Sequence, residues 1–142
     1  MQTISWACTS TWRQASYNTF WCLLGCAAGD LGTIAYFQFT ATPFPVWGIM
    51  ALAMTNGILT SIALETVILA RQQPLRQAFR TAIGMSLISM LAMEFAMNAV
   101  DLAMVGTARL TPSVIPLMLI AGFVAPLPYN YWRLKALGKS CH

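Results

Sequence analysis

The sequence predicts an all-α integral membrane protein, an up-down four-helix bundle with both termini in the cytoplasm. Of its 142 residues, 58% are hydrophobic and only 8% are charged. A soluble domain carries about a quarter charged residues. The apolar residues gather into four segments, each long enough for a hydrocarbon core that needs about 20 helical residues. We therefore expect a single transmembrane domain over residues 1–142, in contact with the lipid bilayer and without a separate soluble domain.

Four spans are expected, at residues 17–39, 46–70, 79–105 and 113–132. Pro43 and Pro45 separate the first two segments, because proline does not fit in a helix interior. The sequence Arg-Gln-Gln-Pro that ends at Pro74 separates the second and third segments, and the stretch from Gly106 to Pro112 separates the third and fourth. Connections this short make consecutive helices antiparallel neighbours, which is the up-down arrangement of a bundle.

The last span has no charge in its middle but contains three prolines, Pro116, Pro126 and Pro128. Each proline removes a backbone donor, so the helix is expected to kink and to free carbonyl oxygens that need partners. Pro128 and Asn130 lie in a rigid segment near the end of this span. We expect both residues to have a structural role in helix packing.

The basic residues predict the orientation in the membrane. Seven of the eight fall on one side of a four-span arrangement: Arg13, Arg71, Arg76, Arg80, Arg133, Lys135 and Lys139. Only Arg109 falls on the other side. The positive-inside rule then places both termini in the cytoplasm. The net charge of +4 fits an anionic lipid surface and does not point to nucleic acid.

The four acidic residues lie inside the hydrophobic segments, where each is costly unless paired, protonated or bound to an ion. Asp30 lies about 13 residues into the first span and Glu94 about 15 into the third, so at 1.5 Å per residue they reach nearly the same depth. If their faces meet, the two carboxyl groups share a proton or hold a cation. Asp101 would mark the outer mouth of the same path. Glu65 is expected to pair with Arg71 or another basic residue near the cytoplasmic interface.

In the first span, Cys22, Cys26 and Asp30 are spaced i, i+4, i+8 and stack along one helix face. Gly25 and Gly29 form a G-x-x-x-G pair, and Gly32 lies one turn further on. Small residues at this spacing favour the close approach of a neighbouring helix. The two cysteines are either ligands or small apolar residues that fill the core, and the sequence leaves both interpretations open.

One face of the third span carries two carboxylates, an amide and three thioethers within an arc of roughly 120°. Its members are Met90, Glu94, Met97, Asn98, Asp101 and Met104. Lipid cannot satisfy buried acids, so this face must look inward. Thiolates and thioethers select soft metals such as copper, whereas carboxylates favour protons or hard cations. The predicted metal ligands are Cys22, Cys26, Asp30, Met90, Met93, Glu94, Met97, Asn98 and Asp101.

These segments resemble the bacterial membrane proteins of the domain-of-unknown-function family numbered 4396. The resemblance extends over nearly the whole chain, in order and spacing. The family pattern falls here on Cys22, Gly25, Cys26, Gly29, Asp30, Met93, Glu94, Asn98, Pro128, Asn130 and Trp132. Two positions depart from it, because Trp21 replaces a histidine and Met97 replaces an aspartate. Asp101, one turn beyond Met97, is the residue that could compensate. The resemblance implies the fold and a bacterial inner-membrane location, and it implies no reaction.

Three functions are weighed. The first is the binding or transport of a soft metal ion, or the relay of cations or protons, through the polar cavity between the first and third spans. The second is a non-catalytic accessory or structural subunit of a larger membrane complex. A homodimer fits a chain of this size.

The third function, a membrane thiol oxidoreductase, is disfavoured because Cys22 and Cys26 lack the Cys-x-x-Cys spacing. No catalytic residue is predicted, since no nucleophile–base pair or nucleotide fingerprint is present. At the chain ends, a Cys-His site formed by Cys8, Cys141 and His142 competes with the simpler interpretation of a frayed tail.

Overall fold

A computed structural model describes residues 6–136, and within that range the regular structure is entirely helical. The helices are α1 (Thr9–Thr40), α2 (Val46–Leu69), α3 (Leu75–Val105), α4 (Ile115–Val124) and α5 (Leu127–Ala136). Three segments are long and apolar enough to cross a membrane, namely Thr9–Thr40, Val46–Leu69 and Ser86–Val105. The all-α prediction is thereby confirmed, and these three segments correspond to the first three predicted spans.

Two of the three long helices begin directly after a proline, and two end next to a residue in the left-handed conformation. α1 ends before Ala41, which adopts a left-handed conformation with φ of 49°, and the prolines that follow prevent its continuation. α2 starts directly after Pro45 and α3 directly after Pro74. α3 ends at Gly106, whose φ of 77° is the left-handed helix cap that glycine adopts most readily.

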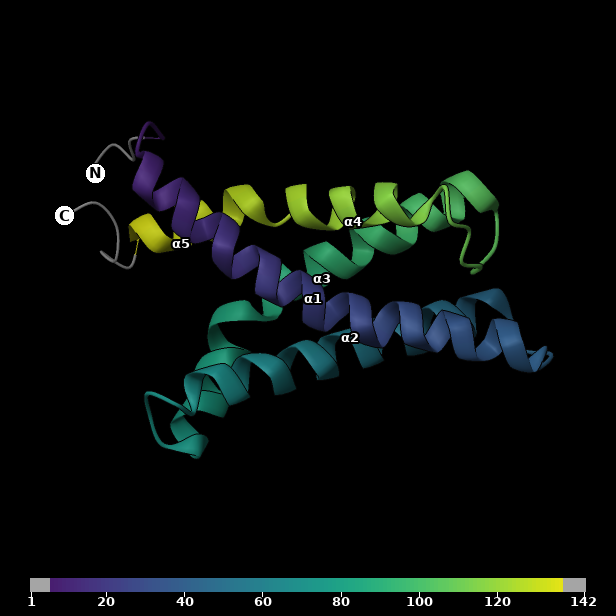
Figure 1. Cartoon of the computed structure of the whole chain (residues 1–142), viewed down its shortest axis with the longest axis horizontal. Helices are drawn as coiled ribbons and strands as arrows, with labels where there is room; N and C mark the ends of the chain where they lie inside the picture. Colours follow the sequence, from purple (N-terminus) through teal and green to yellow (C-terminus); the bar gives the residue numbers. More distant parts are fainter. Residues whose placement is uncertain (1–5, 137–142) are drawn as a thin grey trace.

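The predicted fourth span, residues 113–132, is not one continuous helix. α4 ends at Val124, and α5 begins at Leu127 after a break at Pro126. Pro126 cannot donate a backbone hydrogen bond, so the helix stops there instead of only bending. Each piece has 10 residues, or about 15 Å, half of a hydrocarbon core of about 30 Å. The two pieces follow one another along the molecule (Figure 1).

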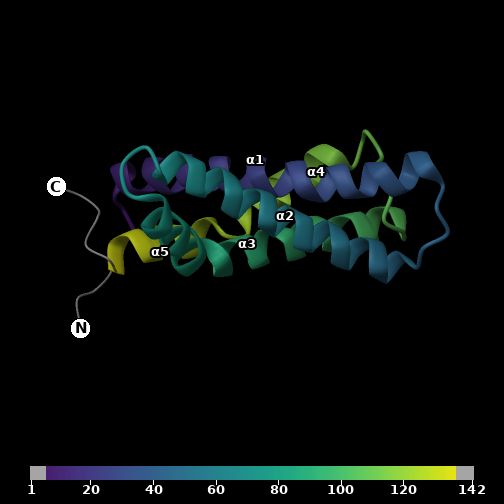
Figure 2. The ribbon, with the colours of Figure 1, turned by 90° about the horizontal axis from the view of Figure 1, so that it is seen from below.

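The connectivity alternates between the two ends of the molecule (Figures 1 and 2). α1 begins, α5 ends and α2 connects to α3 at one end, while the α1–α2 and α3–α4 connections lie at the other. α1 packs most extensively against α2 and also contacts α3, α4 and α5. It therefore holds the other helices together, and side chains from four helices meet along it.

α5 is attached to the start of α1 by polar and aromatic contacts. Asn130 Nδ2 donates to Thr19 Oγ1 at 2.7 Å, and both residues are buried. Tyr131 is fully buried, with its ring centroid 4.3 Å from that of Trp12. Asn130 thus joins two helices, whereas Pro128 lies on the exposed side of α5.

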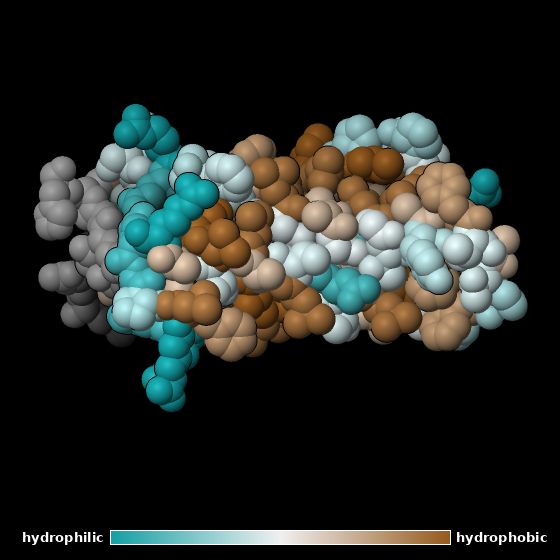
Figure 3. Space-filling view, turned by 60° about the horizontal axis from the view of Figure 1, so that its bottom comes forward, coloured by the Kyte–Doolittle hydropathy of each residue, from teal (hydrophilic) through white to brown (hydrophobic). Residues whose placement is uncertain are grey.

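Large apolar side chains cover the outside of the helices. Phe39, Trp47 and Phe95 are 85%, 73% and 71% exposed, although such groups are costly in water. In the space-filling view, hydrophilic residues gather at one end, and the rest of the face is made of hydrophobic residues around a central area of intermediate hydropathy (Figure 3). An apolar belt next to a polar end is the surface that a bilayer requires.

Candidate functional site

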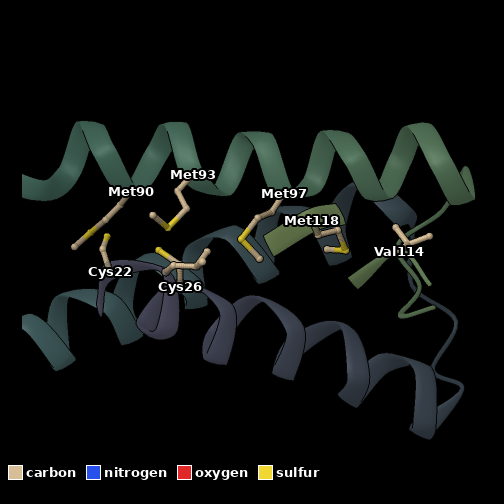
Figure 4. Packing of buried hydrophobic residues seen from close by; sticks show 8 residues of the cluster. Cys22, Cys26, Met90, Met93, Met97, Val114 and Met118 are labelled. Atoms are coloured by element: carbon tan, nitrogen blue, oxygen red, sulfur yellow. The ribbon is translucent and has the colours of Figure 1, made fainter. Parts of the chain in front are cut away.

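The centre of the molecule is a buried cluster rich in sulfur. Cys22 and Cys26 of α1 point toward Met90, Met93 and Met97 of α3, and Met118 of α4 completes the group (Figure 4). The four methionines and Cys26 are fully buried, and Cys22 is 3% exposed. We call these six residues the sulfur cluster. Met118 was not among the predicted ligands, because nothing in the sequence of the fourth segment marks it as facing the other sulfurs.

The two cysteines carry free thiols, and these thiols interact with one another. Ser61 of α2 fixes the first of them. Its hydroxyl donates to the carbonyl oxygen of Cys22 at 3.1 Å and lies 3.4 Å from Cys22 Sγ. Because the single serine proton is used on the carbonyl, the thiol is the donor in the second bond. Cys22 Sγ is therefore oriented by α2, and Cys26 Sγ has a neighbouring sulfur on its own helix.

Glycines allow α2 to come this close. A Cβ atom on Gly25 would lie 2.5 Å from Ser61 Cα, and one on Gly29 would overlap the backbone of Asn56. Gly32, by contrast, has no atom within 4 Å of its Cβ position. Gly57 of α2 was missed by the sequence analysis, because it belongs to no spacing pattern. A Cβ atom there would overlap Glu94 Oε1, so Gly57 makes room for this carboxyl group.

The structure brings Asp30 and Glu94 together, as their equal depth predicts. Asn98 Nδ2 donates to Asp30 Oδ1 at 3.0 Å and to the carbonyl oxygen of Glu94, also at 3.0 Å. The two carboxyl groups are electrostatic neighbours, and that of Glu94 also interacts with Cys26. All three polar residues of this group are 2% exposed or less. A buried polar group therefore lies next to the sulfur cluster, on the side toward the other end of the bundle. Its members are Asp30, Glu94 and Asn98.

Several oxygens of this polar group have no hydrogen-bond partner within residues 6–136. They are Asp30 Oδ2, both carboxyl oxygens of Glu94, and Asn98 Oδ1. A buried acceptor without a donor costs about 1–3 kcal/mol, and more if it is charged. Four such acceptors beside two thiols form an arrangement that a proton or a cation would stabilise.

Glu65 is not paired with Arg71, which is exposed. Its Oε2 accepts a hydrogen bond from Ser86 Oγ at 2.6 Å, and its charged neighbour is Arg133 of α5. The basic residue near Glu65 is thus far away in the sequence, and the hydrogen-bond partner of the carboxyl group is Ser86 and not an arginine. Glu65 also lies beside Cys22, so it borders the sulfur cluster.

Asp101 is fully buried at the opposite end of the site. Its Oδ2 accepts a hydrogen bond from the backbone N–H of Arg109 at 3.3 Å, which attaches the α3–α4 connection to α3. Asp101 is an electrostatic neighbour of Asp30 but is not a member of the sulfur cluster. The acids and thiols of the interior therefore follow one another through the bundle, in the order Glu65, which is half-buried, Cys22, Cys26, Glu94, Asp30 and Asp101.

Two residues that the sequence analysis singled out, Met104 and Trp21, lie outside the buried site. Met104 was placed on the inward face of the third span, but it is 60% exposed. Trp21, which replaces the histidine of the family pattern, packs edge-on against Tyr17 and Phe20 on α1. Cys141 and His142, part of the tail site considered above, lie outside the described residues.

No three side chains of the types His, Cys, Asp and Glu are grouped as metal ligands in the part of the chain that the structure describes. A hard metal ion would need such a set of ligands. A soft metal ion can also be bound by thioethers, so methionine side chains count among its ligands. The donors that do converge here are sulfur atoms.

These features define the class of protein. It is an all-helical chain with three apolar helices long enough to cross a membrane, and its buried core contains thiols, thioethers and carboxyl groups. The chain belongs to the family described as a domain of unknown function, DUF4396, which matches residues 11–139. The resemblance inferred from sequence motifs is thereby confirmed. No curated protein and no solved structure shows a match to the chain.

Proposed function

We propose that this chain is a bacterial inner-membrane protein that binds a soft metal ion, Cu(I), in its sulfur cluster and transfers it within the membrane. The observation that carries the proposal is that six sulfur atoms from three helices lie in one buried cluster, with the thiols of Cys22 and Cys26 facing the thioethers of Met90 and Met93. Cu(I) prefers thiolate and thioether ligands to oxygen ligands. The cluster offers both ligand types and excludes water.

The carboxyl groups beside the cluster fit the same chemistry. Thiols must lose their protons to bind a metal, so binding releases protons. Glu94 borders Cys26 and Glu65 borders Cys22, so each thiol has a carboxylate next to it. The proton that leaves Cys26 Sγ when a Cu–S bond forms would pass to the pair of Asp30 and Glu94, whose two carboxyl groups share one proton and can take up a second. The acids would thus accept protons, and the sulfur atoms would hold the metal.

Purified protein in detergent should compete with a colorimetric Cu(I) chelator under anaerobic conditions and retain about one Cu(I) per chain. Replacing both thiols by hydroxyls, Cys22→Ser with Cys26→Ser, keeps size and hydrogen bonding but removes the soft ligands. We expect this variant to lose affinity by roughly 100-fold or more.

The matched control for this titration is Met104→Leu, which removes an exposed thioether from the same helix as three cluster methionines. Its Cu(I) affinity should equal that of the unmodified protein. The proposal is wrong if the unmodified protein fails to compete with the chelator, or if the serine variant competes equally well.

We also propose that α4 and α5 together form a fourth crossing and that both termini lie in the cytoplasm. Basic residues concentrate at the end of the molecule where α1 begins, α5 ends and α2 connects to α3, and cytoplasmic segments are enriched in such residues. A fluorescent protein fused after residue 142 should then be fluorescent, and alkaline phosphatase fused there should be inactive. An active phosphatase fusion would contradict this orientation.

A further inference from the structure

A hollow of about 430 Å³ lies on the outer face between α1 and α2. Its lining includes Gly29, Gly32 and Thr33 of α1, and Leu52, Asn56 and Thr60 of α2. We call it the α1–α2 groove. It contains no charged residue. In the space-filling view, pale residues of intermediate hydropathy form a band within the brown middle of the molecule (Figure 3). Leu52, Asn56 and Thr60 lie in the middle part of α2, so the groove is at a depth where lipid chains would surround it.

Asn56 is an unusual residue for that position. It is the eleventh of the 24 residues of α2 (56 − 46 + 1 = 11), which places it near the middle of the span, and its side chain is exposed. Its Nδ2 donates to Thr33 Oγ1 at 2.8 Å. Within residues 6–136 the amide oxygen accepts no hydrogen bond, and lipid chains offer none.

The two threonines of the groove do not share this property. Thr33 Oγ1 donates to the carbonyl oxygen of Gly29 at 2.7 Å, and Thr60 Oγ1 donates to that of Gly25 at 2.6 Å. Their hydroxyl protons are therefore used inside the chain. Asn56, by contrast with the two threonines, retains both an acceptor and a second N–H donor for a group outside the chain.

We propose that the α1–α2 groove is the homodimer interface, in which Asn56 of each chain hydrogen-bonds with Asn56 of a second copy across a two-fold axis. A carboxamide is its own complement, because it carries a donor and an acceptor, and an isologous interface places identical residues opposite each other. Gly32 has no neighbour within its own chain and leaves space for a partner helix. This proposal is independent of the copper proposal, since no residue of α3 and no member of the sulfur cluster lines the groove.

Single-molecule photobleaching of labelled protein, diluted into lipid vesicles, measures the fraction of dimers. The unmodified protein should be dimeric, and Asn56→Leu should weaken the dimer by about tenfold or more, because polar contacts between membrane helices contribute about 1–2 kcal/mol. Gly32→Leu should have a similar effect by filling the groove. The matched control is Thr55→Leu, since the hydroxyl of Thr55 bonds only to its own helix, at Ala51; its dimer fraction should not change.

Three outcomes would overturn the dimer proposal. The first is a monomeric unmodified protein at every dilution. The second is a dimer that both Asn56→Leu and Gly32→Leu leave intact. The third is co-purification of a different membrane protein that Asn56→Leu releases, because the groove would then bind that protein and not a second copy. Helical content measured by circular dichroism shows that each variant is folded.

Discussion

Gly25→Leu should lower the midpoint of thermal unfolding by about 10 °C or more. The new side chain would start 2.5 Å from the backbone of Ser61, and a backbone atom cannot move aside as a flexible side chain can. α2 would have to retreat, which breaks the hydrogen bonds from Ser61 to Cys22 and from Thr60 to Gly25. Overpacking of this kind costs about 1–3 kcal/mol, and each lost bond adds to the free-energy cost.

The control for this substitution is Gly84→Leu. A Cβ atom on Gly84 would meet no atom within 4 Å, so the same change in residue type should leave the unfolding midpoint within about 2 °C of that of the unmodified protein. Unfolding can be followed by circular dichroism and by the reaction of the buried thiols of Cys22 and Cys26 with a fluorescent reagent. Equal midpoints for the two variants would show that α1 and α2 do not pack through Gly25.

The second large effect concerns the buried hydrogen bond between Asn98 and Asp30. Asn98→Leu removes the donor to Asp30 Oδ1 and leaves a fully buried carboxyl group without a partner within residues 6–136. Such a change should lower the free energy of unfolding by about 2–3 kcal/mol. Asp30→Leu alone should cost less, since removing a buried acid together with its need for a partner is often neutral or even stabilising.

A double-mutant cycle separates this interaction from general packing. Asn98→Leu combined with Asp30→Leu should be less destabilising than the sum of the single variants, with a coupling energy of about 1–3 kcal/mol. The bond between Asn130 and Thr19 provides a matched neutral pair, for which about 0.6 kcal/mol is expected inside a membrane. Unfolding free energies measured in mixed detergents give both values. A coupling near zero for Asn98 and Asp30 would exclude a stabilising role for their contact.

The depth of the acidic residues could be predicted from the sequence, but the rotation of the helices could not. Asp30 and Glu94 lie at the same depth because the rise per residue of a helix is constant, so counting from the span ends is sufficient to predict that depth. The inward direction of Met118 and the outward direction of Met104 depend on rotation. α4 carries no polar side chain among its 10 residues, so no polar stripe reveals which of its sides faces the core.

The fourth segment shows a second limit of prediction from the sequence. Its prolines predicted a kink, but whether a helix bends or stops depends on whether other groups satisfy the freed carbonyls. Here the chain breaks at Pro126, and α5 is held instead by the contacts of Asn130 and Tyr131 with α1. Glu65 illustrates the same difficulty. Its charged neighbour Arg133 lies 68 positions away in the sequence (133 − 65 = 68), and the docking of α5 brings the two residues near each other.

X-ray absorption spectroscopy of the protein loaded with one Cu(I) per chain tests the central claim most directly, because it identifies the atoms bound to the metal. The sulfur cluster predicts a first shell made of sulfur only, and this shell should be lost when Cys22 and Cys26 are both replaced by serine. A first shell of oxygen or nitrogen, or a sulfur shell that persists in the serine variant, would place the metal elsewhere and contradict the proposed site.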